Sequence, residues 1–138
     1  MLIPIIGLAT AGVYALLAKR LKVTSYAKQF LGVPYAWGGT TPQGFDCSGF
    51  VKYVFENANT TLPRTANEQY KFAEPINKDT IRSGDLVFFK DNLNNPVKHV
   101  GIVLNQNEFI HASTSQGVTI TPLNNSYWQP RIFAFGRV

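Results

Sequence analysis

DCSGF, residues 46–50, contains the one cysteine of a 138-residue chain and lies where a loop pattern gives way to a helical one. The preceding residues 38–44 hold three glycines and a proline, which predicts a loop. Apolar residues then recur at helical spacing. This pattern predicts a helix that runs to about Asn57, with Asp46 or Ser48 as its N-cap.

Cys47 falls in the first turn of this predicted helix. Unpaired backbone N–H groups and the helix dipole favour a thiolate there, so the sequence predicts a lowered pKa for Cys47. A lone cysteine is also often a small buried hydrophobic residue. A catalytic role therefore requires that the chain supply a base, an orienting group and a cleft.

The length of the chain fits one domain with a substantial core. Its net charge of +5 suits a polyanionic surface, but the basic residues are scattered apart from residues 19–22. No cysteine or histidine cluster has zinc spacing, and no glycine pattern has the phosphate-loop form. We therefore expect no metal, no cofactor and no nucleic-acid partner. A single cysteine excludes an intramolecular disulfide.

Residues 1–23 form an apolar segment that we expect to be helical and separate from a domain at residues 24–138, which begins with Thr24 or Ser25 as a helix cap. Its uncharged part, residues 2–18, is at the lower limit of about 17 residues for a membrane-spanning helix. Small residues at every fourth position also favour close helix contacts. The segment is either a membrane anchor or a contact with other subunits of an assembly. A cleaved signal fits less well, because the positive charges follow the apolar run.

The domain pattern places helices before strands. Thr65 and Glu68 predict a capping box at the start of a short helix. Short apolar runs then predict strands at residues 86–89, 99–104, 109–113, 118–120 and 132–135. This order indicates an α+β fold, with the N-terminal helices packed on a central antiparallel sheet.

Both histidines of the chain lie on one predicted hairpin. A three-residue loop at residues 105–107 makes His99 and His111 diagonal neighbours on one face of the hairpin, whereas a two-residue loop places them on opposite faces. Each histidine alone is more often structural than catalytic. If both histidines lie close to Cys47 in the fold, Cys47 is the nucleophile, His99 is its base and His111 orients His99.

Six short motifs occur in order between residues 25 and 138. They are residues 34–39 (PYAWGG), 46–50 (DCSGF), 62–65 (LPRT), 83–89 (SGDLVFF), 99–102 (HVGI) and 109–112 (FIHA). With these motifs the chain resembles the NlpC/P60 cysteine peptidases of bacterial cell walls. The resemblance implies a compact papain-like fold, with the apolar N-terminal helix as an addition. It also implies cleavage of peptidoglycan stem peptides between D-glutamate and the diamino acid, without a cofactor.

The resemblance also assigns roles to individual residues. Cys47 attacks the peptide carbonyl, His99 takes the thiol proton, and His111 fills the third polar position. Four further residues are implied to bind substrate, Asp46 and Ser48 at the free amine of the stem peptide and Tyr35 and Arg64 along the cleft. Tyr35 and Trp37 could equally cover the edge of the core.

The chain departs from many relatives outside the domain, because it shows neither a clear secretion signal nor wall-binding repeats. We therefore expect a phage tail or a secretion assembly to deliver it, so that it acts at the bacterial envelope as a virion-associated or membrane-anchored protein. The alternative from another class is a structural or wall-binding component of such an assembly with little catalytic activity. Amidase or acyltransferase activity on another substrate also stays open.

Overall fold

The computed structural model describes residues 3–138, and for residues 3–10 it describes the helical backbone alone. Helix α1 (Ile3–Lys28) runs without a break through the position where a second helix was predicted to begin. The predicted cap at Thr24 or Ser25 is therefore wrong. The Thr24 hydroxyl instead donates to the backbone carbonyls of Arg20 and Leu21 (3.1 and 3.3 Å), as a threonine inside a helix commonly does.

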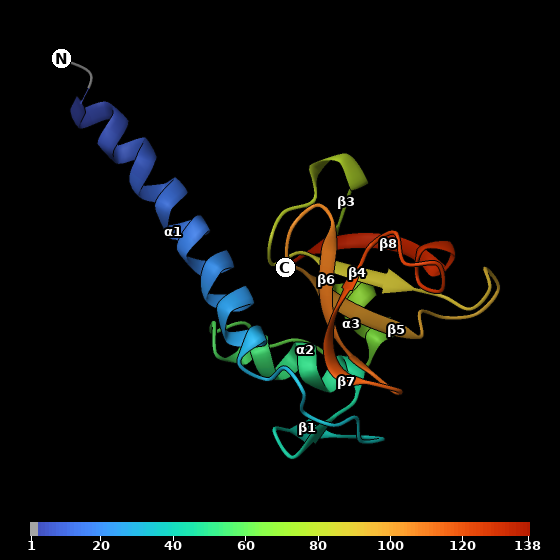
Figure 1. Ribbon diagram of the computed structural model, residues 1–138. Helices are drawn as coiled ribbons and strands as arrows, with labels where there is room; N and C mark the ends of the chain where they lie inside the picture. The colour runs from blue at the N-terminus through green and yellow to red at the C-terminus, as the bar shows by residue number, and fades with distance from the viewer. Residues whose placement is uncertain (1–2) are drawn as a thin grey trace.

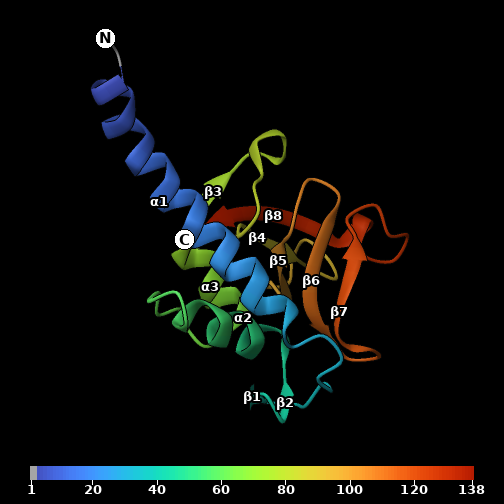
Figure 2. The same cartoon turned by 60° about the vertical axis from the view of Figure 1, so that its left-hand side comes forward.

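The two ends of α1 have different surroundings. Val23 and Ala27, near its C-terminal end, are buried in the main core. The N-terminal end extends away from the sheet and the other helices in both Figure 1 and Figure 2. Apolar side chains along this part are exposed, namely Val13, Tyr14, Leu16, Leu17 and Leu21. Within the described part of the chain, no helix combines the length and the apolar character needed to cross a bilayer.

Helix α2 (Cys47–Glu56) has the predicted extent and the predicted N-cap. One carboxylate oxygen of Asp46 accepts a hydrogen bond from the Gly49 backbone N–H (2.6 Å). The loop before the helix lies across its first turn, and a Cβ at position 49 would overlap the carbonyl oxygen of Gly39. Glycine at position 49 therefore lets the loop pack close to Cys47.

Helix α3 (Ala66–Phe72) begins with the capping box that the sequence predicts. The Thr65 hydroxyl accepts from the Glu68 N–H (3.2 Å), and the Glu68 carboxylate accepts from the Thr65 N–H (3.2 Å). Gln69 is fully buried and donates to the carbonyls of Ser48 (3.1 Å) and Pro63 (2.9 Å). This side chain ties α3 to the first turn of α2.

Six strands form one antiparallel sheet in the order β3-β8-β4-β5-β6-β7 (Figure 1). The predicted α+β class with a central antiparallel sheet is confirmed, although the sequence did not predict β3 or the two-stranded sheet of β1 and β2. The strands are β1 (Thr40–Thr41), β2 (Gly44–Phe45), β3 (Glu74–Ile76), β4 (Leu86–Phe89), β5 (His99–Val103), β6 (Glu108–Ser113), β7 (Gly117–Pro122) and β8 (Ile132–Arg137). Short 3-10 helices lie at Lys78–Thr80 and Gln129–Arg131.

Alternate residues of the central strands enter two separate cores, as the pleat of a sheet requires. One core lies against the helices and includes Phe88, Val100 and Ile110 with Phe50 of α2. The other includes Phe89 and Phe109 with residues of the loop before β8. The first residue of α2, Cys47, contacts the carbonyl of Lys98, which directly precedes β5.

The β5–β6 hairpin has the register that brings the histidines together. Ile102 pairs with Ile110 and Val103 with Phe109, so the loop is residues 105–107. This is the three-residue alternative, and His99 and His111 lie on the same face of the sheet.

Candidate active site

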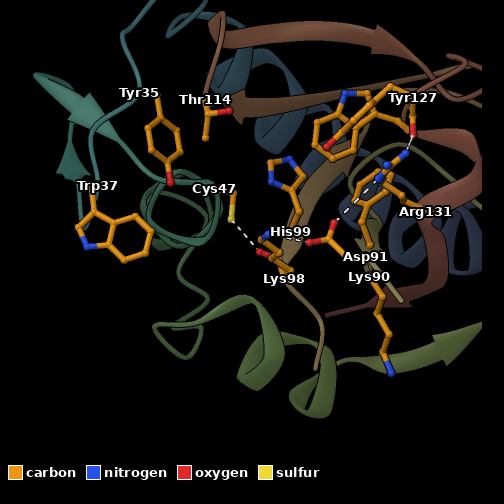
Figure 3. Close-up of a pocket in the computed structure, with 12 residues that line it drawn as sticks. Tyr35, Trp37, Cys47, Lys90, Asp91, Lys98, His99, Thr114, Tyr127 and Arg131 are labelled. Carbon is orange, nitrogen blue, oxygen red and sulfur yellow. Dashed lines mark hydrogen bonds and ion pairs between the residues drawn. The ribbon is translucent and has the colours of Figure 1, made fainter. Parts of the chain in front are cut away.

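Cys47 is the first residue of α2, and its thiol enters a cavity of about 370 Å³. His99, at the start of β5, lines the same cavity. Figure 3 shows Tyr35 and Trp37 on one side of the Cys47–His99 pair, with Tyr127 and Arg131 on the other. The thiol donates a long hydrogen bond to the carbonyl of Lys98 (3.8 Å). The helix and the sheet thus bring the predicted nucleophile and base to one cleft.

A hydrogen-bonded row continues from His99 into the sheet. His99 Nε2 lies 2.7 Å from His111 Nδ1, and His111 Nε2 lies 2.9 Å from Thr121 Oγ1. His111 and Thr121 are buried. Because His99 uses Nε2 in this row, its Nδ1 is the ring nitrogen left for Cys47 and a substrate.

Aromatic rings enclose the two imidazoles. The Trp128 ring stacks on His99 with centroids 4.5 Å apart, and it meets His111 edge to face at 5.0 Å. Phe89 and Phe109 pack against His99 and His111 at 5.5 and 4.4 Å. We refer to His99, His111, Thr121 and Trp128 as the histidine side of the cleft. Of these residues, His111 and Thr121 are buried, whereas His99 and Trp128 are half-buried and line the cavity.

Burial sets the protonation of the site. It lowers the pKa of His99 to about 3 and that of His111 to about 2, where the neighbouring His99 contributes a smaller share. It also raises the pKa of Cys47 to about 11. Backbone N–H groups of Val100, Ser48 and Cys47 act in the opposite direction, but burial, together with the smaller effect of the Asp46 carboxylate, outweighs them. The prediction of a lowered Cys47 pKa is therefore wrong, because the first helical turn lies inside the fold. The free protein holds a neutral thiol beside a neutral imidazole.

A charged network lies on the other side of Cys47. Arg64 donates to both carboxylate oxygens of Asp46 (3.1 and 2.6 Å) and to the Ser48 hydroxyl (3.0 Å). We refer to Asp46, Ser48 and Arg64 as the carboxylate side. Asp46 and Ser48 line a second cavity of about 330 Å³ that also reaches Cys47 and Tyr35. Arg64 does not line this cavity itself, but its hydrogen-bond partners Asp46 and Ser48 do.

The predicted site residues therefore gather around Cys47. Asp46, which was predicted to bind the substrate, already has hydrogen-bond partners within the protein. Its carboxylate already accepts hydrogen bonds from the Gly49 N–H and from Arg64. Tyr35 lines both cavities, and burial raises its pKa, with further contributions from the negative forms of Cys47 and Asp46. Asp46 is thus a fixed acceptor whose charge is partly balanced before any substrate arrives.

Sequence reasoning missed Trp128 and Thr121. Trp128 lies in the irregular segment before β8, where no periodic pattern identifies it. Thr121 pairs with Phe109 across β6 and β7, two residues along from the pair of His111 with Thr119. The hairpin argument that joins the histidines would have found Thr121 if it had been extended by one strand. Among residues 3–138, no group of three or more His, Cys, Asp or Glu side chains could hold a metal ion.

Comparison with known proteins adds a family to this geometry. The model of the NlpC/P60 family matches residues 32–137. The chain is 48% identical over 111 residues to the probable peptidoglycan endopeptidase LytE of Bacillus subtilis, covering 80% of this chain and 32% of that protein. It is 44% identical over 101 residues to Escherichia coli murein DD-endopeptidase MepS/murein LD-carboxypeptidase, covering 72% of this chain and 53% of the relative. The chain therefore spans about a third to a half of these relatives.

A solved structure of an NlpC/P60 family protein from Bacillus cereus superposes with a TM-score of 0.81 at 32% identity. The match covers 86% of this chain and 39% of that structure. The shared part is thus the domain that carries Cys47 and the histidines, which confirms the resemblance in fold.

Proposed function

Because the chain belongs to the NlpC/P60 family, we propose that it is a cysteine endopeptidase that cleaves peptidoglycan stem peptides between D-glutamate and the diamino acid. The observation that carries the proposal is the unbroken row from the cleft to Thr121, in which His99 binds His111 (2.7 Å) beside the Cys47 thiol. A nucleophile, a base and an orienting group at one cleft are the parts that acyl transfer needs. The names of the relatives supply the substrate class.

In the first step, His99 Nδ1 takes the thiol proton as Cys47 Sγ attacks the peptide carbonyl. Since both groups are neutral in the free protein, proton transfer accompanies attack instead of preceding it. The backbone N–H groups of Cys47 and Ser48, at the start of α2, are the proposed donors to the developing oxyanion, and both already act to lower the pKa of the Cys47 thiol.

In the second step, the carbon–nitrogen bond breaks and the protonated His99 gives its proton to the leaving amine. The acyl group stays on Cys47 as a thioester. Water, deprotonated by His99, then attacks the thioester and releases the free acid with return of the proton to sulfur. His99 therefore acts as base and then as acid in each half of the reaction.

Proton delivery by His99 also assigns the two cavities. The leaving amine must lie next to His99, so the cavity that contains His99 receives the leaving group. The cavity with Asp46 and Ser48, which reaches Cys47 from the other side, receives the acyl part. Lys90, Lys98 and Arg131 line the leaving-group cavity against one acidic residue, Asp91. This excess of positive charge suits a leaving fragment that carries carboxylates, as a stem-peptide fragment does.

On the acyl side, Asp46, Ser48 and Tyr35 are the proposed contacts of the stem peptide's free amine. The Asp46 carboxylate is bound to Arg64, and its second oxygen accepts from Arg64 alone among the hydrogen bonds of the described residues. An ammonium group at that oxygen would form a charge-assisted hydrogen bond. Arg64 would then hold the carboxylate in place rather than bind substrate itself.

Helix α1 is the proposed attachment to a larger assembly or to a membrane. Its support is the row of exposed apolar side chains on a helix that projects from the domain (Figure 1). Delivery by a phage tail or a secretion apparatus, with action at the bacterial envelope, belongs to the same proposal. Extraction from native membranes by a carbonate wash would favour an assembly over a bilayer anchor.

An inert wall-binding role is the second candidate, because a thiol with a pKa near 11 beside a neutral histidine could also be a silent site. The deciding experiment incubates the protein and its Cys47→Ala variant with purified stem peptides and identifies the products by mass spectrometry. We expect the unaltered protein alone to release fragments cut after D-glutamate. Fragments cut at another bond would correct the specificity, and no fragments at all would overturn the proposed peptidase.

A further inference from the structure

Three polar side chains form a diagonal row across β5, β6 and β7. His99 and His111 are offset by two residues across the first strand pair, and His111 and Thr121 are offset by two across the second. The row ends at Thr121 Oγ1, 2.9 Å from His111 Nε2. From this geometry we propose that Thr121 is a positioning residue, which accepts a hydrogen bond from His111 and thereby keeps His99 in the tautomer that can act as a base. The inference rests on the proposed peptidase function.

The row permits two arrangements of protons when both histidines are neutral. In the first, His99 donates from Nε2 to His111, and His111 donates from Nε2 to Thr121. Nδ1 of His99 is then bare and can take the Cys47 proton. In the second, Thr121 donates to His111 and His111 donates to His99. His99 then carries its proton on Nδ1 and cannot act as a base.

Burial makes the far end of the row decisive. His111 is fully buried between Phe109 and Trp128, so its Nε2 has Thr121 as its partner and not bulk water. Buried N–H groups without an acceptor are rarer in proteins than buried acceptors without a donor. Loss of the Thr121 oxygen should therefore favour the arrangement with no proton on His111 Nε2, which is the inactive one.

The hydroxyl hydrogen of Thr121 has hydrogen-bond acceptors other than His111 within reach. Thr121 borders a cavity of about 400 Å³ with Ser113, Ser115 and Asn125. A hydroxyl hydrogen that points into this cavity can bond to water or to those polar groups, which leaves the Thr121 oxygen free to accept from His111. The cavity also provides water to any variant that has room for it.

Three substitutions at position 121 test the proposal through kcat and KM on a stem peptide. Thr121→Ser keeps the oxygen and should stay within about 3-fold of the unaltered kcat. Thr121→Val keeps the volume but removes the acceptor and excludes water, and it should lower kcat by about 10-fold or more, within the roughly 10²–10⁴-fold that general-base catalysis supplies. Thr121→Ala leaves space for a water to replace the hydroxyl, so its kcat should lie between the two.

The order of these variants separates positioning from packing. A purely structural role would make Thr121→Ala the worst, because it leaves the larger cavity, whereas the proposal makes Thr121→Val the worst. KM should change little in all three, because Thr121 lies behind the histidines. A Thr121→Val variant with unaltered kcat, or a loss confined to KM, would overturn the inference.

Nitrogen NMR of ¹⁵N-histidine protein provides a readout that needs no substrate, and the chain has two histidines to assign. In the unaltered protein, the proton should reside on Nε2 of both rings, and in Thr121→Val it should shift toward Nδ1 of both. A proton on His111 Nδ1 in the unaltered protein overturns the inference even if no variant folds. If the tautomers are as proposed but no peptide is cut, the peptidase proposal fails and the positioning role stands.

Discussion

The two sides of the cleft hold Cys47 by opposite physical means. The carboxylate side is ionic, with Arg64 bound to Asp46 and Ser48 and with part of each charged side chain open to solvent. The histidine side is neutral and walled by aromatic rings, with His111 and Thr121 buried and His99 and Trp128 half-buried. The difference indicates separate roles for the two sides. Charged groups on the carboxylate side can bind a polar substrate, whereas electrostatic interactions with His99 become stronger in a site that excludes water when charge develops beside it.

Removal of the Cys47 sulfur should cause the largest loss of peptide cleavage, since the proposed roles of both sides of the cleft depend on this nucleophile. Cys47→Ala should lower cleavage by at least about 10⁴-fold, with a free energy of unfolding within about 1 kcal/mol of the unaltered protein. Peptide cleavage followed by mass spectrometry, together with urea unfolding, measures the two. Cys47→Ser is the matched control of similar shape and should also be nearly inactive, because the neutral His99 is a weak base for a hydroxyl. Full activity of Cys47→Ala would exclude the mechanism.

Within the histidine side, the loss should decrease with distance from the sulfur. His99→Ala removes the base and should cost about 10³-fold in kcat, whereas His111→Ala leaves thiol and base in place and should cost about 10²-fold. Steady-state kinetics on one stem peptide would rank them. If His111→Ala were the more damaging, the base would have been assigned to the wrong histidine.

The protonation of Cys47 gives the next effect in size. With a pKa of about 11, the thiolate fraction grows about tenfold per pH unit below that value, so alkylation by iodoacetamide should accelerate about 100-fold between pH 7 and pH 9. Glutathione serves as the reference thiol, and its rate should begin to level off near its lower pKa. A Cys47 rate that is flat between pH 6 and pH 8 would indicate a preformed thiolate–imidazolium pair and contradict the neutral state.

The parts of the site that the sequence predicted follow from local rules. Asp46 before an apolar helical run predicted its own capping bond, and Thr65 with Glu68 predicted the capping box, because the donors and acceptors lie within three residues. The pairing of His99 with His111 depended on the length of one loop. Such features can be read from a sequence because few residues decide them.

The parts that it did not predict depend on tertiary packing. The helix start at Cys47 suggested a thiolate, but burial by residues distant in the chain reversed the direction. Thr24 resembles a helix cap in its local sequence. However, helix α1 continues through Thr24, and its residues Val23 and Ala27 are buried in the core. Trp128 reaches His99 from a loop with no periodic pattern. Burial and long-range stacking have no signature in a short stretch of sequence.

On the carboxylate side, we expect the smallest effects, which are changes in stability. They distinguish the two roles of Asp46, as the N-cap of α2 and as the ionic partner of Arg64. Asparagine caps helices as well as aspartate does, so Asp46→Asn should keep the bond from the Gly49 N–H and lose the ionic contact with Arg64. Because the Arg64 side chain is 38% exposed, that contact should contribute less than about 1 kcal/mol. Asp46→Ala loses the cap as well and should be less stable than Asp46→Asn by about 1 kcal/mol in urea unfolding.

The same two variants report on binding. If Asp46 contacts the substrate amine, both should raise KM to a similar extent while kcat changes less, because the neutral amide and the methyl group both lack the negative charge that an ammonium requires. Arg64→Gln is the matched control, since it leaves the Asp46 carboxylate in place without its partner. A rise in KM for the Asp46 variants but not for Arg64→Gln would assign the substrate contact to the carboxylate, whereas equal rises in all three would assign it to the intact network.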